Sequence, residues 1–103
     1  MLILQSAIGH LIHLTVTYMT SSQLLQEFEA LAHRMGIPIS REDLMGGMGG
    51  LCTIRGEKRI ILDYRLDVPT QVDVLAQSFS RLPLDDIFIK PSVRERIDGF
   101  DNT

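Results

Sequence analysis

Two short apolar runs, separated by a glycine and a glutamate, constrain the fold of this chain more than any other feature of its sequence. The runs cover residues 51–55 and 58–63, and Gly56 and Glu57 connect them. Such runs, rich in isoleucine and leucine and bounded by glycine, are typical of β-strands. A glycine in the first position of a two-residue connection favours a type II′ turn, so the segment is predicted to form a β-hairpin.

The predicted pairing gives the hairpin two different faces. With a turn at Gly56 and Glu57, Cys52 lies opposite Ile61, and opposed residues share a face. Because Thr53 makes its own face the more polar one, we expect helices to cover the face that carries Cys52. The Cys52 face holds Cys52, Ile54 and Ile61, and the other face holds Leu51, Thr53, Ile60 and Leu62, with Arg55 and Lys58 at the tip.

The face without Cys52 is the predicted interaction surface. An aliphatic side chain left in water forfeits about 1.5–3 kcal/mol, so a second subunit, or the residues before Met19, should cover this face. A homodimer is the first hypothesis, and it predicts that Leu62→Asp gives folded monomers whereas Ile61→Asp unfolds the chain. The surface consists of Leu51, Ile60, Leu62, Arg55 and Lys58.

A helix is predicted before the hairpin, over residues 22–35, where apolar side chains recur at spacings of three and four. Ser21 or Ser22 can cap its first turn, and Gly36 supplies a left-handed stop. Residues 37–41 alternate in polarity and contain a proline, which restricts them to an edge strand.

A second helix is predicted after the hairpin, with Asp67 as its cap and Pro69 in its first turn. A short extended piece at 87–89 and a charged helix from Pro91 follow, and a polar tail at 99–103 should fray. The sequence therefore predicts a small single α+β domain over residues 19–98, with a hairpin, an additional edge strand and a short C-terminal helix.

The N-terminal residues 1–18 are apolar, and no charged residue occurs before Glu27. Polar residues interrupt them too often for a membrane span, and a signal peptide would need a basic start. Two interpretations stay open: Met19 is the true start of the protein, or the segment covers part of the core or of a subunit contact. We expect a chain that begins at Met19 to fold.

Charge and cysteine content exclude several classes of function. Thirteen acidic residues outnumber ten basic residues, and the net charge of −3 argues against binding to a nucleic-acid backbone. The single cysteine, Cys52, cannot form an internal disulfide, which favours a reducing, cytoplasmic location. Cys52 sits mid-strand among apolar neighbours, so we expect it to be buried and slow to react.

The loop that runs from Gly46 to Gly50 contains four glycines, whose N–H groups could form an anion-binding nest. A phosphate loop of the usual kind follows a strand and opens a helix, whereas this loop leads into a strand. We therefore expect a flexible connection with positive φ angles, and a flap beside a site is the alternative.

No residue pattern predicts a metal centre or a cofactor. His10 and His13 have the spacing of helical metal ligands, but no further ligand lies at a matching distance in the sequence. Asp67 is better explained as a helix cap, and the other aspartates that could gather in space are predicted to lie on the surface. These aspartates are Asp63, Asp85 and Asp86.

The order of helix, hairpin and second helix over residues 24–82, with Leu75 and Ala76 in the second helix, resembles the N-terminal half of the ImmA/IrrE-type zinc metallopeptidases. In that family the second helix carries Leu-Ala-His-Glu-Leu-Gly-His. On this overlay Gln77 and Arg81 replace the zinc-binding histidines, and Ser78 replaces the general base. The resemblance therefore implies a scaffold without peptidase activity, which should hold no stoichiometric zinc.

The chain also resembles a group of short bacterial proteins of unassigned function, which share the Gly-Gly-Leu-Cys hairpin start found from Gly49 to Cys52. That second resemblance implies no activity.

Two functional hypotheses follow. The first is a non-enzymatic domain that acts through protein contacts, because no catalytic constellation is complete and the hairpin is apolar on both faces. The second is an enzyme or small-ligand binder that uses the glycine loop, Cys52 and nearby aspartates. A concave pocket where Cys52 or an aspartate with a strongly shifted pKa faces the glycine loop would favour the second hypothesis, and a flat apolar patch would favour the first.

Overall fold

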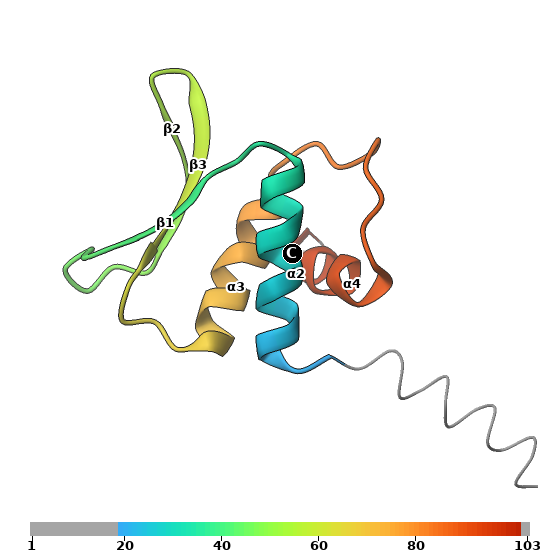
Figure 1. Cartoon of the computed structure of the whole chain (residues 1–103), viewed down its shortest axis with the longest axis horizontal. Coiled ribbons are helices and arrows are strands. Elements are labelled where there is room, and N and C mark those ends of the chain that lie inside the picture. The colour runs from blue at the N-terminus through green and yellow to red at the C-terminus, as the bar shows by residue number, and fades with distance from the viewer. Residues whose placement is uncertain (1–18, 102–103) are drawn as a thin grey trace, which may run out of the picture.

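The computed structural model describes residues 19–101, in which a three-stranded sheet has all three helices on one side, with the last helix behind the other two (Figure 1). This arrangement confirms the predicted α+β class. The interpretations of residues 1–18 lie outside the described residues, as do residues 102 and 103. The elements, in chain order, are α2 (Ser21–Arg34), β1 (Ile39–Glu42), β2 (Gly49–Ile54), β3 (Glu57–Asp63), α3 (Val68–Phe79) and α4 (Pro91–Asp101).

Helix α2 begins one residue earlier than predicted because its cap is Thr20. The Thr20 hydroxyl accepts the N–H of Gln23 at 3.1 Å, and the Gln23 side chain accepts the N–H of Thr20 at 2.8 Å. This reciprocal pair satisfies two N–H groups that would otherwise lack partners at the helix start. At the other end Gly36 has a φ of +71°, as the sequence predicted.

The sheet has the order β1-β3-β2, so β1 and β2 are both edge strands. Strand β1 runs parallel to β3, and the carbonyl of Pro38, just before it, accepts the N–H of Ile60 at 2.9 Å. A proline has no N–H to donate, and the start of an edge strand is a position where this N–H is not needed. The edge-strand prediction is confirmed.

The hairpin turn lies one residue earlier than predicted, at Arg55 and Gly56. Both residues have positive φ angles, of 54° and 82°, which defines a type I′ turn. Cys52 therefore pairs with Arg59 rather than with Ile61. The prediction placed the glycine first in the turn, whereas a type I′ turn, which matches the twist of the strands, accepts it in the second position.

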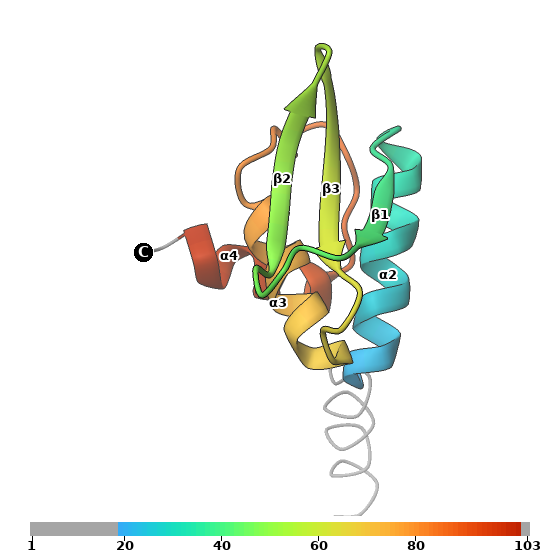
Figure 2. The same cartoon turned by 90° about the vertical axis from the view of Figure 1, so that its left-hand side faces the viewer.

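The prediction of which hairpin face meets the helices is wrong. Ile60 and Leu62 are 0% exposed and belong to the core, whereas Ile54 on the opposite face is 44% exposed. Thr53 shares the face of Ile60 but is exposed, because it lies near the tip of the hairpin. This tip projects beyond the helices (Figure 2). Because Thr53 is not buried, its polar side chain carries no desolvation cost and does not decide which face of the hairpin meets the helices.

This orientation overturns the predicted interaction surface. Ile60 and Leu62 have no surface to offer a partner, and Leu51 is half-buried against the same core. Only Arg55 and Lys58, at the exposed tip, keep the predicted accessibility.

The core lies between the sheet and the helices, with the rings of Phe28 on α2 and Phe79 on α3 stacked at 5.6 Å between centroids. Asp67 caps α3 by accepting the N–H of Thr70 at 2.9 Å, as predicted.

Helix α4 packs on α2 and α3. It continues through residues 99–101, where a frayed tail was predicted, because Phe100 packs against the core. Residues 87–89 form no strand.

Candidate functional site

An open groove of about 390 Å³ runs between strand β2 and the C-terminal end of helix α3. One wall is formed by residues 49–52, the first part of β2. The groove therefore brings the end of the glycine loop and Cys52 together with the end of α3. The rest of the lining comes from Leu44, Ile61, Gln77, Ser78 and Arg81.

The wall formed by β2 is a strand edge with free hydrogen-bonding groups. Asp63 donates its backbone N–H to the carbonyl of Met48 at 3.0 Å, next to the β2–β3 ladder. Hydrogen-bonded pairs alternate along an antiparallel ladder, so residues 50, 52 and 54 direct their backbone groups at β3. The N–H and C=O groups of Leu51 and Thr53 therefore point away from β3, and no strand of the described chain pairs with them.

The wall formed by the end of α3 and the turn after it carries the three residues that the resemblance placed at the zinc site. The Ser78 hydroxyl is buried and donates to the carbonyl of Val74 at 2.8 Å, so it is held within its own helix. Gln77 and Arg81 are exposed, and no hydrogen bond or ion pair of their side chains occurs among residues 19–101. Gln77 lies in the last turn of α3 and Arg81 in the turn that follows the helix, and both line the groove.

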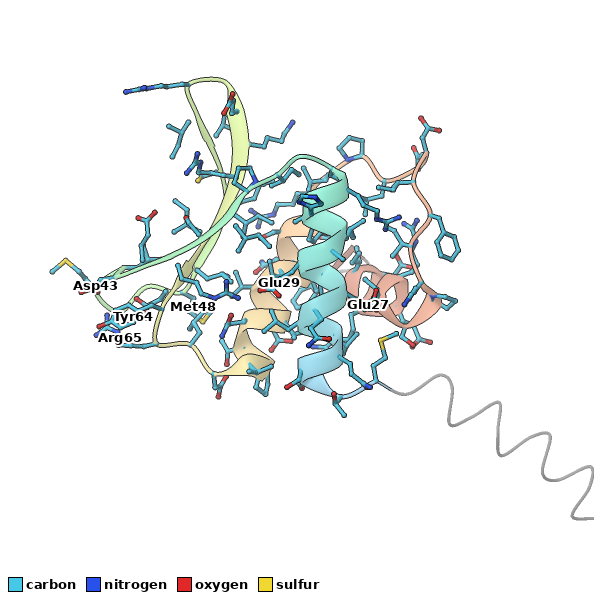
Figure 3. All side chains as sticks on the ribbon, viewed as in Figure 1. Glu27, Glu29, Asp43, Met48, Tyr64 and Arg65 are labelled. Carbon is cyan, nitrogen blue, oxygen red and sulfur yellow. The ribbon has the colours of Figure 1, made fainter. Side chains whose placement is uncertain are left out.

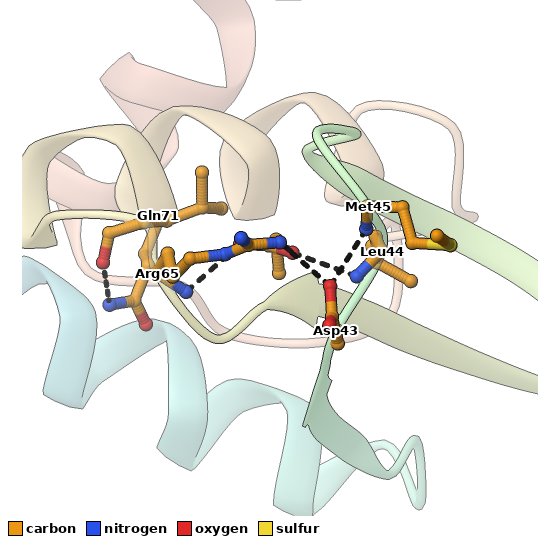
Figure 4. A network of polar contacts seen from close by, with 7 residues as sticks. Asp43, Leu44, Met45, Arg65 and Gln71 are labelled. Atoms are coloured by element: carbon orange, nitrogen blue, oxygen red, sulfur yellow. Dashed lines mark hydrogen bonds and ion pairs between the residues drawn. The ribbon is translucent and has the colours of Figure 1, made fainter.

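Asp63 fixes the loop that borders the groove. It is 4% exposed, which contradicts the prediction of a surface aspartate. Its carboxylate accepts the N–H of Leu44 at 2.8 Å and that of Arg65 at 2.9 Å, and the Arg65 guanidinium bonds it at 3.3 Å (Figure 4). These bonds, that from Leu44 foremost, lower the pKa of Asp63 to about 2. The carboxylate is therefore a structural clasp that is ionised at neutral pH.

Arg65 extends this clasp to the loop itself by pairing with Asp43 at 2.7 Å. Figure 3 shows Asp43, Met48, Tyr64 and Arg65 gathered at the end of the sheet where β3 ends, on the side away from α2. The side chains of Met48 and Tyr64 are exposed there. Sequence reasoning missed this cluster because its members come from two loops that meet only in the fold.

The glycine loop has the predicted positive φ angles at Gly46, Gly49 and Gly50, and it leads into β2 rather than into a helix. The close packing of β2 against the backbone of β3 also requires a glycine at position 49. A Cβ atom there would lie 1.9 Å from the carbonyl oxygen of Ile61, far inside van der Waals contact. The loop is therefore a shaped connection to the groove, without the helix start that a phosphate loop uses.

Of the other candidate residues that the structure describes, only Cys52 joins the groove. Cys52 lines it and is half-buried rather than buried as predicted. Asp67 caps α3, and Asp85 and Asp86 are exposed in the loop before α4. Within the described chain no cluster of His, Cys, Asp and Glu could hold a metal ion. His10 and His13 lie outside that part. Within residues 19–101, no helix is both long enough and apolar enough to span a bilayer.

Comparison with known proteins gives no relative: no protein-family model matches this chain, and neither does any curated protein or solved structure.

Proposed function

We propose that this chain is a non-enzymatic protein-contact domain that accepts an extended segment of another chain as an additional strand on the free edge of β2. One observation carries the proposal: the outward N–H and C=O groups of Leu51 lie at the groove between β2 and α3, and those of Thr53 continue the same open edge. An added strand would pair with these groups, and the groove offers room for its side chains.

The two sheet edges differ in a way that supports this assignment. Natural edges are usually protected by short length, proline or charged side chains. Strand β1 has these devices, because it contains only four residues, follows Pro38 and carries Arg41 and Glu42. Strand β2 contains six residues with the sequence GGLCTI, which includes neither a charge nor a proline. An edge left open in this way is suited to pairing.

The enzymatic alternative has one feature in its favour, since Cys52 and the glycine loop share a concave groove. No histidine or carboxylate lines that groove among the described residues, so neither Cys52 nor Ser78 has a base to activate it. The groove therefore supports binding better than catalysis. The proposal includes action in the cytoplasm, because one unpaired cysteine fits a reducing compartment.

The test selects random dodecapeptides displayed on phage against the immobilised full-length chain, and then measures their binding to two variants. Thr53→Pro removes one outward N–H at an exposed edge position, where proline is tolerated, and Thr53→Val keeps that N–H. Selected peptides should bind the wild type and Thr53→Val, and they should lose most of their affinity for Thr53→Pro. Circular dichroism must show that both variants keep the fold.

Equal binding to all three proteins would overturn strand addition at β2, and so would the failure of any peptide to be enriched. Light scattering without peptide tests whether the partner strand comes from a second copy, which is the homodimer expected from the sequence. If Thr53→Pro converts a dimer to monomers, strand addition at β2 is supported and the partner strand comes from a second copy of this chain.

A further inference from the structure

Arg81 is the one charged side chain in the lining of the groove. Three other arginines of the described chain form ion pairs, Arg41 with Glu29, Arg65 with Asp43, and Arg96 with Asp73. The described arginines for which no ion pair is seen besides Arg81, namely Arg34, Arg55, Arg59 and Arg94, do not all have free side chains, and only Arg81 lines the groove. Arg81 is exposed and forms no ion pair within residues 19–101. The carboxylates of Glu29, Asp43 and Asp73 pair with other arginines. A cation without a counter-ion therefore stands directly beside the free strand edge.

We infer that the segment accepted by β2 is acidic and places an aspartate or glutamate side chain against Arg81. This inference rests on the proposed function and names the chemistry of its partner. A guanidinium binds a carboxylate with two parallel hydrogen bonds, and the side-chain amide of Gln77, which lines the same groove, can donate a further one. No acidic residue lines the groove, so nothing there would repel an incoming carboxylate.

The path of the edge favours an internal acidic side chain over a terminal carboxylate. The groove ends at Cys52, but the edge continues through Thr53 and Ile54 to a tip that projects beyond the helices (Figure 2). A strand paired with β2 can therefore run on past Arg81, and its chain does not need to end there.

A second copy of this chain is a less suitable occupant of the same edge. Two β2 strands paired around Leu51 would bring both Arg81 side chains into one shared groove, because Leu51 and Arg81 line it together. Two guanidinium groups at close range repel each other, whereas a guanidinium and a carboxylate attract. Charge complementarity therefore indicates a different, acidic protein.

The experiment measures the dissociation constants of selected peptides, acetylated and amidated at their ends, by fluorescence anisotropy. The inference expects the selected peptides to share an aspartate or glutamate. Arg81→Gln should weaken binding by about five-fold, the size expected of an exposed ion pair. Changing the acidic residue of the peptide to its amide should have a similar effect, and combining both changes should add little further loss. Arg81→Lys should restore part of the affinity, and Arg55→Gln, at the hairpin tip, is the matched control that should leave it unchanged.

The outcomes separate this inference from the proposed function. Peptides that depend on the Thr53 edge but bind Arg81→Gln as tightly as wild type would overturn the acidic partner and leave strand addition standing. Loss of binding on amidation of the C-terminus would show that a terminal carboxylate is recognised, which overturns the internal side chain. A dimer split by Thr53→Pro would also overturn it, because the second copy would then occupy the edge.

Discussion

The carboxylate of Asp63 accepts the backbone N–H of Leu44 at 2.8 Å and thereby ties the end of β3 to the loop that borders the groove. Leu44 itself lines the groove, so the position of this wall depends on an aspartate at the opposite end of the hairpin from its turn. The second oxygen of Asp63 accepts the N–H of Arg65, whose guanidinium in turn holds Asp43. Four residues therefore set the shape of this end of the sheet.

Removal of the Asp63 carboxylate should loosen this clasp. Asp63→Ala leaves the N–H groups of Leu44 and Arg65 without their acceptor, and Asp63→Asn keeps an acceptor but loses the charge that pairs with Arg65. We expect the Tm to fall by several degrees in Asp63→Ala and by less in Asp63→Asn, measured by circular dichroism. Asp86→Asn, at an exposed position outside the clasp, is the control. Equal melting of Asp63→Ala and this control would contradict the assignment.

Asp63 should also make stability depend on pH in the acid range. Its pKa is about 2 in the fold, against an ordinary value of 3.8, because the N–H of Leu44 and the Arg65 side chain stabilise the charged form. A lowered folded-state pKa means that the unfolded chain binds protons first as pH falls. The stabilisation should therefore be complete above about pH 4 and disappear between pH 3.8 and about 2.

Urea unfolding at a series of pH values checks this dependence, with Asp63→Asn expected to flatten the acid limb. Asp67 contributes in the same direction, since the hydroxyl and N–H of Thr70 lower its pKa. Asp67→Asn removes that titration and keeps a good N-cap, so the two contributions can be separated. An unchanged acid limb in Asp63→Asn would show that other carboxylates dominate.

Gly49→Ala and Gly46→Ala should differ sharply in their effects. Both positions have positive φ angles, which costs a residue with a side chain about 1–3 kcal/mol. Only at Gly49 would the new Cβ also collide with the carbonyl of Ile61, whereas the space around Gly46 is empty. We therefore expect Gly46→Ala to fold with reduced stability and Gly49→Ala to disrupt the β2–β3 pairing. Equal free energies of unfolding in urea would refute the close approach.

Aspartate substitutions on the two hairpin faces test the observed orientation. Leu62→Asp would bury an unpaired carboxylate in the core and should cost roughly 3–5 kcal/mol or more, enough to unfold a small domain. Ile54→Asp lies on the exposed face and should change the free energy of unfolding by no more than about 0.5 kcal/mol. Thermal melts of both variants decide the matter, and a stable Leu62→Asp protein would restore the orientation expected from the sequence.

Local sequence was sufficient for the elements whose signals lie within one turn or one strand. Asp67 followed by Pro69 predicted the start of α3, Gly36 predicted the end of α2, and the two apolar runs predicted the hairpin. Each of these depends on bonds and backbone angles among near neighbours, so no distant part of the chain had to be known. The α+β class follows from their order.

Only the tertiary structure decided the hairpin orientation, the burial of Asp63 and the groove. The orientation depends on where the helices end relative to the strands, which left Thr53 in water and made its polarity irrelevant. The sequence predicts that Asp63 is exposed. Its burial depends on the N–H of Leu44, which lies nineteen residues away in the sequence and meets the carboxylate only in the fold. The open edge of β2 beside Arg81 depends in the same way on chain topology and long-range packing, which residue periodicity does not encode.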